Sequence, residues 1–314
     1  WQQIAQVLGR TSTLLILDNF EGLVDSAPHL ADLLQQAAGC RLLVTSRQAL
    51  DLYEEWVFPL QGLAYPRQSD TSDWDKYSAL QLFYQQARRR NLHFSFENQR
   101  EAVLRLCQVL EGWPLGIELA AAWVHVLSCQ EILDRLLANL DLPDSVFRNL
   151  PERQRSLRAV FQSSWDLLTG LERQALARSS LFEGGFTLLA AERVTGCNAR
   201  VMASLVSKSL LRLRSDGRYE MHSLLRAFAG ELLDEVEAAA ARQAHTHFYA
   251  VLLSQLNVSL AGPREGEALQ QIEVEIDNLR AAWGWLNAEA LVGQPAATPA
   301  ADGPLALLEH FVPM

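Results

Sequence analysis

The pattern of hydrophobic positions changes about a quarter of the way along this chain, from short unbroken apolar runs to apolar residues at helical spacing. Residues 13–17 and 41–45 are runs in which apolar and polar positions do not alternate, a pattern typical of strands buried on both faces of a parallel sheet. Between these runs, Ser26 can cap a helix that has Pro28 in its first turn. Strand, helix and strand with short connections predict a βαβ unit with parallel strands. Residues 56–60 predict one more short strand.

After a polar boundary at residues 67–75, apolar residues recur at helical spacing almost to the end of the chain. Gly112-Trp113-Pro114 interrupts this pattern, and Asp216-Gly217 is a strong signal for a hairpin turn. Three helices followed by a hairpin is the layout of a winged helix. The helices expected are residues 79–87, 102–110, 114–124, 157–168, 171–181, 188–194, 201–208 and 223–236, then amphipathic helices over 238–290; the hairpin strands expected are 210–214 and 218–221.

Composition indicates a globular chain of more than one domain. Its 314 residues include 27 Lys and Arg against 37 Asp and Glu, and the net charge of −10 disfavours nonspecific attraction to nucleic acid or anionic membranes. No apolar run is long enough to span a membrane, and no signal peptide opens the chain, so a cytoplasmic location is predicted. Because the first residue is Trp1, we expect the chain to begin inside a larger protein.

The cysteines and histidines predict no metal site. The four cysteines occur singly, which favours reduced core thiols over a zinc site or a disulfide framework. His245 and His247 are two positions apart, so they cannot share a helix face as metal ligands at i and i+4 would. We interpret both histidines as surface or packing residues.

Polar residues follow both predicted strands. Asp18 ends the first and Ser46-Arg47 ends the second, so parallel pairing brings them to one edge of the sheet. In nucleotide-hydrolysing proteins, a carboxylate at this edge holds Mg²⁺ or its water shell beside the phosphates. An aspartate that caps a turn after a strand would give the same pattern, and both interpretations of Asp18 stay open.

Five segments, in order, resemble the STAND signal-transduction NTPases, specifically their bacterial NB-ARC-like, AfsR-type branch. Residues 14–21 are similar to the Walker B strand of that family, and residues 42–47 to its sensor strand, which ends in Thr-Ser-Arg. Residues 112–120 are similar to its Gly-x-Pro motif. Residues 219–226 resemble the Met-His-Asp motif of its winged helix, and residues 275–282 the start of its tetratricopeptide-like repeats.

The resemblance implies a multidomain, mainly α fold that begins with a partial α/β P-loop NTPase sheet. The divisions expected are 1–66, the C-terminal part of the nucleotide-binding domain; 67–149, a helical lid bundle; 150–236, a winged helix; 237–292, the first tetratricopeptide-like helices; and 293–314, a disordered linker and a truncated helix.

The resemblance also implies a role for each motif residue. Asp18 would position Mg²⁺ and Arg47 would reach the terminal phosphate. Pro114, after Gly112, would pack against the adenine, and His222 would donate a hydrogen bond to the β-phosphate of ADP. Ordinary structural roles remain open beside these: a surface salt bridge for Arg47, a helix start for Pro114, and a satisfied structural position for His222.

Three departures from the family pattern limit what the resemblance implies. Asp18 is followed by Asn19 and not by a second acid, so weak or absent hydrolysis is expected unless Glu21 acts as the base. Ser223 stands at the third position of the Met-His-Asp motif. No Gly-x-x-x-x-Gly-Lys-Ser/Thr loop occurs, so the phosphate cradle and the strand before it are missing. The two strands would then face an empty slot or pair directly, and either arrangement would remove the nucleotide pocket as the family builds it.

The function implied is that of a fragment of a regulatory ATPase, closed with ADP and opened by exchange for ATP. The whole protein would be a slow ATPase in signal transduction or transcription, and this chain without its phosphate loop would be inactive. Its partners would be an adenine nucleotide, an inducer or protein bound by the repeats, and further subunits in a nucleotide-dependent oligomer, with DNA bound only by a domain outside these residues. Two rivals stay open: a DNA-binding winged helix that uses Arg200 and Lys208, and a nucleotide-free repeat scaffold.

Overall fold

The computed structural model describes residues 2–9, 12–67, 74–139, 156–260 and 262–292. These residues divide into two compact units: those within 1–61 and 204–210 form the first, and those within 62–203 and 211–292 form the second. The described fold is mainly α with a small parallel sheet in the first unit, which confirms that part of the predicted fold class. The linker and truncated helix predicted at 293–314 lie outside the described residues.

The first unit contains the predicted βαβ motif. Strands β1 (Thr13–Leu17) and β2 (Cys40–Val44) pair in parallel along their whole length. Helix α2 (Pro28–Gln36) makes the crossover, and α1 (Gln2–Leu8) precedes β1 and packs against α2. Of the two arrangements expected without an intervening strand, direct pairing is the one that occurs.

Within the described residues of the first unit only one face of this sheet is covered, which corrects the prediction of strands buried on both faces. The side chains of Leu14 and Ile16 are each 59% exposed, and that of Leu43 is 52% exposed. The opposite face packs on a core that includes Phe20 and Leu30. An unbroken apolar run therefore identified the strands correctly but not what covers them, because burial depends on elements elsewhere in the chain.

The strand predicted at residues 56–60 is wrong. This segment belongs to neither a helix nor a strand, and Trp56 and Phe58 are 97% and 84% exposed. A strand needs a partner for its backbone groups, and none of the described strands pairs with this segment. Pro59 also has no N–H to donate to a ladder.

The predicted cap of α2 is also corrected. Ser26 ends the 3₁₀ helix η1 (Phe20–Ser26), and Ala27, with helical φ and ψ, stands between it and α2. Pro28 does occupy the first turn of α2, where its missing N–H has no intrahelical acceptor to lose.

A bundle of four helices forms the start of the second unit. Its helices are α3 (Ser78–Arg90), α4 (Phe96–Val109), α5 (Pro114–Ala121) and α6 (Cys129–Asn139), preceded by the 3₁₀ turn η2 (Trp74–Lys76). Helix α3 packs on α4 and α5, and α4 packs on α6 around fully buried side chains such as Phe83, Leu106 and Ile132. Helix α5 ends at Ala121, before the predicted end at residue 124.

A helix-hairpin region follows the bundle. Its elements are α7 (Leu157–Trp165), α8 (Gly170–Ser179), α9 (Leu188–Thr195), α10 (Ala199–Ser207), β3 (Arg212–Leu213), β4 (Tyr219–Glu220) and α11 (Ser223–Glu231). The hairpin forms as predicted, and Gly217 supplies the positive φ of 79° at its turn. Helix α11 ends at Glu231, earlier than the predicted residue 236.

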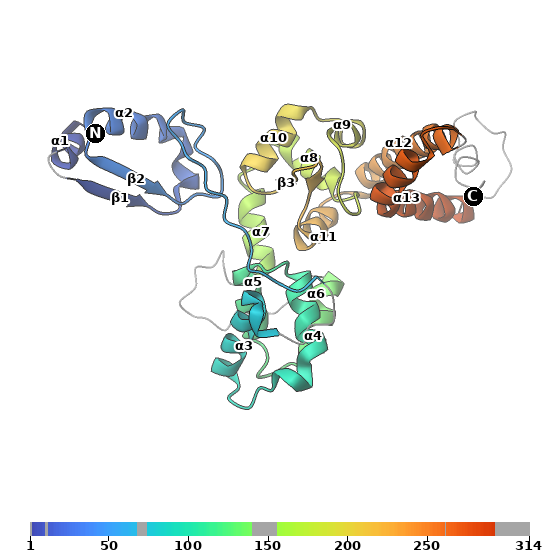
Figure 1. Cartoon of the computed structure of the whole chain (residues 1–314), viewed down its shortest axis with the longest axis horizontal. Coiled ribbons are helices and arrows are strands. Elements are labelled where there is room, and N and C mark those ends of the chain that lie inside the picture. The colour runs from blue at the N-terminus through green and yellow to red at the C-terminus, as the bar shows by residue number, and fades with distance from the viewer. Residues whose placement is uncertain (1, 10–11, 68–73, 140–155, 261, 293–314) are drawn as a thin grey trace. The chain divides into compact units, whose positions relative to one another are not determined.

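Two long helices complete the described chain. Helices α12 (Glu235–Leu260) and α13 (Glu265–Val292) pack side by side (Figure 1), and α12 also packs against α9. Tyr249, Ala250 and Ala282 are fully buried between their neighbours. Among the residues that the structure describes, no helix is both long and apolar enough to cross a membrane.

Candidate functional site

In the first unit, the ends of the two strands are tied together by Thr45. The Thr45 hydroxyl, which follows β2, donates a hydrogen bond to Oδ1 of Asp18, which follows β1. The same Thr45 Oγ1 accepts from the backbone N–H of Asn19 at 3.0 Å, where a φ of 62° turns the chain. Asp18 therefore lies at the carboxyl edge of the sheet, and its contact with Thr45 helps to fix the turn at Asn19. Thr45 was predicted only as part of a motif, and its position directly after the second apolar run was the available signal for its role.

Arg47 lies at the same edge and faces Glu21. Its Nε is 3.5 Å from Oε1 of Glu21, whose side chain is only 8% exposed. A carboxylate so little exposed gains from a neighbouring cation, because it has lost most of its hydration. Arg47 thus forms a salt bridge, the structural role that stayed open for it beside phosphate binding. The Glu21 carboxylate, the candidate base in place of the acid missing after Asp18, is paired with Arg47.

The sheet edge offers a divalent cation few ligands of its own. With Glu21 beside Arg47, the side-chain oxygens that meet directly across the strand ends are those of the Asp18 carboxylate and the Thr45 hydroxyl. In the part of the chain that the structure describes, no group of three or more His, Cys, Asp or Glu side chains could hold a metal. Mg²⁺ commonly binds one or two carboxylates together with phosphate oxygens and water. These donors therefore fit Mg²⁺ only as part of a metal–nucleotide complex.

In the second unit, Gly112 and Pro114 form the turn between α4 and α5. Gly112 has a φ of 70°, and a Cβ at this position would lie 2.0 Å from the carbonyl oxygen of Leu63. The N–H of Leu63 in turn donates to the Gly112 carbonyl at 2.8 Å. Pro114 is the first residue of α5, so it has the ordinary role of starting a helix that stayed open for it beside adenine packing. This turn therefore requires glycine for both backbone angle and space.

His222 stands at the start of α11 and contacts the end of α4. Its Nδ1 accepts a hydrogen bond from the N–H of Leu224 at 3.2 Å, so Nε2 carries the ring proton and donates to the carbonyl oxygen of Leu110 at 3.2 Å. The indole of Trp113 packs edge-on against the imidazole, with 6.3 Å between ring centroids. Two motif segments that are far apart in the sequence thus meet, and the neutral imidazole has both nitrogens satisfied.

Ser223 adds two further hydrogen bonds between the same helix ends. Its N–H donates to Oε1 of Glu111 at 2.9 Å, and its hydroxyl donates to the Val109 carbonyl at 3.1 Å. A carboxylate at a helix N-terminus is favourable because it satisfies a free N–H and complements the helix dipole. We call this set the latch: His222 and Ser223 of α11 with residues 109–111 at the end of α4.

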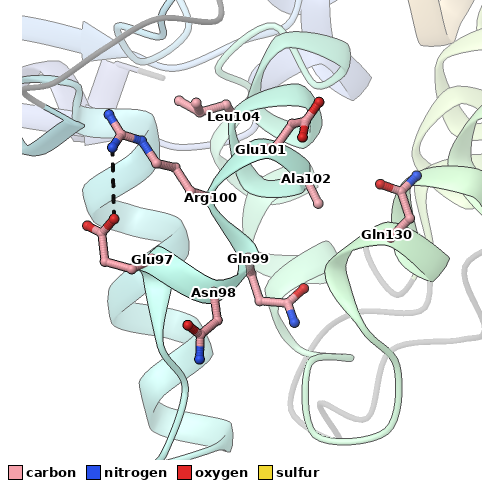
Figure 2. A pocket seen from close by; sticks show the side chains of 8 residues that line it. All are labelled: Glu97, Asn98, Gln99, Arg100, Glu101, Ala102, Leu104 and Gln130. Atoms are coloured by element: carbon pink, nitrogen blue, oxygen red, sulfur yellow. Dashed lines mark ion pairs between the residues drawn. The ribbon is translucent and has the colours of Figure 1, made fainter.

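Two pockets of the second unit lie away from the predicted binding residues Gly112, Pro114 and His222. One, of about 590 Å³, is lined by the first turns of α4 and by Gln130 of α6 (Figure 2); its Glu97 and Arg100 form an ion pair at 3.8 Å. Another, of about 560 Å³, includes Ser223 of the latch together with Arg226, Arg242 and Trp285. Neither lining includes Gly112, Pro114 or His222.

The predicted site residues fall into two groups, one in each unit. Asp18 and Arg47 lie at one sheet edge of the first unit, and Gly112, Pro114 and His222 lie around one turn of the second. Sequence reasoning missed Thr45 in the first group and Glu111 in the second. That all the residues form a single nucleotide site stays a prediction.

Comparison with known proteins relates most of the chain to larger bacterial proteins. A Mycobacterium tuberculosis protein provisionally named an HTH-type transcriptional regulator is 31% identical over 294 residues, which are 90% of this chain and 32% of that protein. A Mycobacterium bovis protein with the same provisional name has the same values. An uncharacterised M. tuberculosis protein is 32% identical over 243 residues, 73% of this chain and 59% of that protein. The chain therefore spans about a third of the length of the first two relatives.

One solved structure gives a weak match over nearly the whole chain. It is a signal transduction ATPase with numerous domains (STAND) that has a tetratricopeptide repeat sensor, from Pyrococcus horikoshii; the match covers 99% of this chain and 45% of that one, with 15% identity and a TM-score of 0.27. Values this low do not establish a shared fold. No protein-family model matches the chain.

Proposed function

We propose that this chain is the switching part of a STAND-type regulatory protein that responds to adenine nucleotides. The observation that carries the proposal is the latch, in which the motif residue His222 bonds to Leu110 beside the Gly-x-Pro turn. A protein that changes conformation needs a discrete contact that can be made and released, and the latch is such a contact. The names of the mycobacterial relatives support a role in transcription. DNA binding would then belong to a domain outside this chain.

In the proposed resting state, ADP holds the latch closed. The helix-hairpin region acts as a winged helix, and the long helix pair begins a tetratricopeptide-like repeat region that receives an inducer or a protein partner. Nε2–H of His222 then donates to the β-phosphate of ADP, a charged acceptor that forms the stronger hydrogen bond, while the Ser223 hydrogen bonds to Glu111 and Val109 keep α11 on the end of α4. Pro114 packs against the adenine, and Asp18 and Arg47 take Mg²⁺ and the terminal phosphate of ATP. Exchange of ADP for ATP releases the winged helix.

Hydrolysis, which would reset this switch, is proposed to be slow. Asp18 is followed by Asn19 and not by a second acid, and the Glu21 carboxylate is engaged by Arg47, so neither position supplies a free carboxylate to activate water. The phosphate loop is also absent from this sequence. We therefore expect this chain by itself to be inactive and to need a phosphate loop supplied by further residues of its protein.

A specific observation also favours the scaffold alternative. Asp18 and Arg47 both have intramolecular partners, so the sheet edge is satisfied without nucleotide. The DNA-binding alternative is weaker, because beyond Arg200 and Lys208 the hairpin adds little: its Arg214 contacts Asp216 and Glu220 at 3.0 and 2.9 Å, and its Arg218 is buried against Glu275. Arginines paired in this way are less available to phosphates.

Calorimetric titration with Mg²⁺ and ADP tests the proposal. It is run on this chain and on the longest natural protein that contains it, each as wild type, as His222→Ala, and as His247→Ala, which removes an exposed histidine of α12. We expect binding by the longer protein alone, weakened by His222→Ala and unchanged by His247→Ala. Absence of binding in both proteins would support the scaffold. Tight binding by the present chain would show that the missing phosphate loop is not required.

A further inference from the structure

Arg218 of the hairpin is buried against a carboxylate of α13. It directly precedes β4, its side chain is 10% exposed, and that of Glu275 is 5% exposed. Nη1 donates to Oε1 of Glu275, and Nη2 donates to Oε2 at 3.0 Å, so the pair is bidentate. Two parallel hydrogen bonds between a guanidinium and a carboxylate fix orientation as well as distance.

Further donors surround this pair and connect both long helices to the hairpin. Tyr249 of α12 donates its hydroxyl to Oε2 of Glu275 at 3.2 Å. Asn278 of α13 donates to the same oxygen and to the Gly185 carbonyl, each at 2.9 Å, and Arg218 also donates to Gly185. The carboxylate therefore accepts hydrogen bonds from the hairpin, α12 and α13 at once. We call these residues the buried clamp.

The buried clamp lies close to the latch along the chain. Arg218 and His222 are separated by the two residues of β4 and by Met221. Strand β4 pairs with β3, and Tyr219 also exchanges two backbone hydrogen bonds with Phe186, at 2.8 and 3.0 Å. A strand held on both sides transmits displacement along its length better than a free loop does. Strand β4 is therefore a well-held connection between Arg218 and His222.

We propose that the Arg218–Glu275 pair couples the long helix pair to the latch, so that a ligand or partner acting on α12 and α13 opens or closes the His222 contact through β4. This inference rests on the proposed function only for its biological purpose, since the coupling itself requires no nucleotide. A buried ion pair suits such a coupling because separating its partners would leave a buried charge without compensation, so the hairpin follows the long helices when they move.

Amide hydrogen exchange of the full chain, without nucleotide, tests the coupling. The latch is followed at the amides of Ser223 and Leu224, which donate to Glu111 and His222. Arg218→Met removes one partner of the pair while keeping much of its volume, and Glu275→Gln keeps oxygen and removes charge. Each should accelerate exchange at the two latch amides by roughly tenfold or more, and the double variant should exceed neither single variant by much, because both break the same contact.

A matched control lies on the same hairpin. Arg214→Met removes an arginine whose side chain is 46% exposed and whose ion pairs are at the surface, so latch exchange should stay at the wild-type rate. The coupling is refuted if Arg218→Met and Glu275→Gln leave the latch amides unchanged. Equal acceleration in α8 would also overturn it, because that result would show general loosening. Neither outcome depends on ADP binding, so failure of the nucleotide proposal is seen separately in the calorimetry.

Discussion

A buried histidine in the long helix pair makes the stability of this region depend on pH. His245 is fully buried, and neither ring nitrogen has a hydrogen-bond partner in the part of the chain that the structure describes. The rings of Phe182, Tyr249 and Trp285 surround it at centroid distances of 5.2, 4.5 and 4.9 Å. Burial lowers the pKa of His245 from 6.5 to about 3, because a charged imidazolium would lose its hydration there; the nearby carboxamide of Asn278 opposes this with a smaller effect.

The sign of the effect follows from which state binds the proton more readily. The pKa of His245 is lower in the folded chain than in the unfolded chain, so protonation favours the unfolded state. The contribution of neutral His245 to the free energy of unfolding is fully present above a pH of about 6.5. It declines as the pH falls and is lost near a pH of about 3, the pKa of His245 in the folded chain. At a pH of about 5, the pH lies about 1.5 units below the unfolded value, and the loss is about 2 kcal/mol, or roughly thirtyfold in the opening equilibrium.

Hydrogen exchange in α12 and α13, corrected for the intrinsic rate at each pH, measures this loss locally, which suits a chain of several domains. His245→Phe keeps an aromatic ring in the apolar cage and removes the titrating group. The difference in protection between wild type and His245→Phe should grow by roughly thirtyfold from pH 7 to pH 5. His247→Phe, at an exposed position on the same helix, should keep the wild-type profile. A constant difference between wild type and His245→Phe across this range would refute the reasoning.

Two further predictions concern the latch and its turn. Gly112→Ala should lower the stability of the bundle by about 2 kcal/mol or more, because the residue has a positive φ and its Cβ would overlap the Leu63 carbonyl. Thermal melting measures this loss. As a control, Gly284→Ala, in open space inside α13, should be neutral or stabilising. Glu111→Ala should cost about 1 kcal/mol and accelerate amide exchange at Ser223, whereas Glu111→Gln, which keeps an acceptor oxygen, should retain most of the protection.

The fold could be predicted from sequence wherever a local pattern determines the local structure. Unbroken apolar runs located β1 and β2, helical spacing located α3, α4 and α5 of the bundle but not α6, and Asp216-Gly217 located the hairpin. The predictions failed where the outcome depends on distant residues. Leu14 and Ile16 are apolar yet exposed, because nothing in the described unit packs on their face of the sheet. Residues 56–60 have the composition of a strand, but none of the strands that the structure describes pairs with them.

The residues of the candidate site could be identified from the sequence, but the contacts that they make could not. His222 and Pro114 were identified from their motifs, but the acceptor of the His222 hydrogen bond is the backbone carbonyl of Leu110, which no side-chain pattern reveals. Arg218 was read only as part of a hairpin strand, although its side chain is buried against Glu275. In a sequence, a buried arginine looks the same as an exposed one, because its partner is supplied by the tertiary fold.

The energies of the latch and the buried clamp suit a switch. Three hydrogen bonds to His222 and Ser223 hold the latch. At about 1 kcal/mol net for each bond, closure is favoured by about 3 kcal/mol. A ligand that binds the open form roughly 150-fold more tightly than the closed form would offset this difference. The Arg218–Glu275 pair is buried and leaves an uncompensated charge when it is broken, so breaking it should cost more free energy than opening the latch. Opening would therefore begin at His222, with the hairpin and the long helix pair still moving as one body.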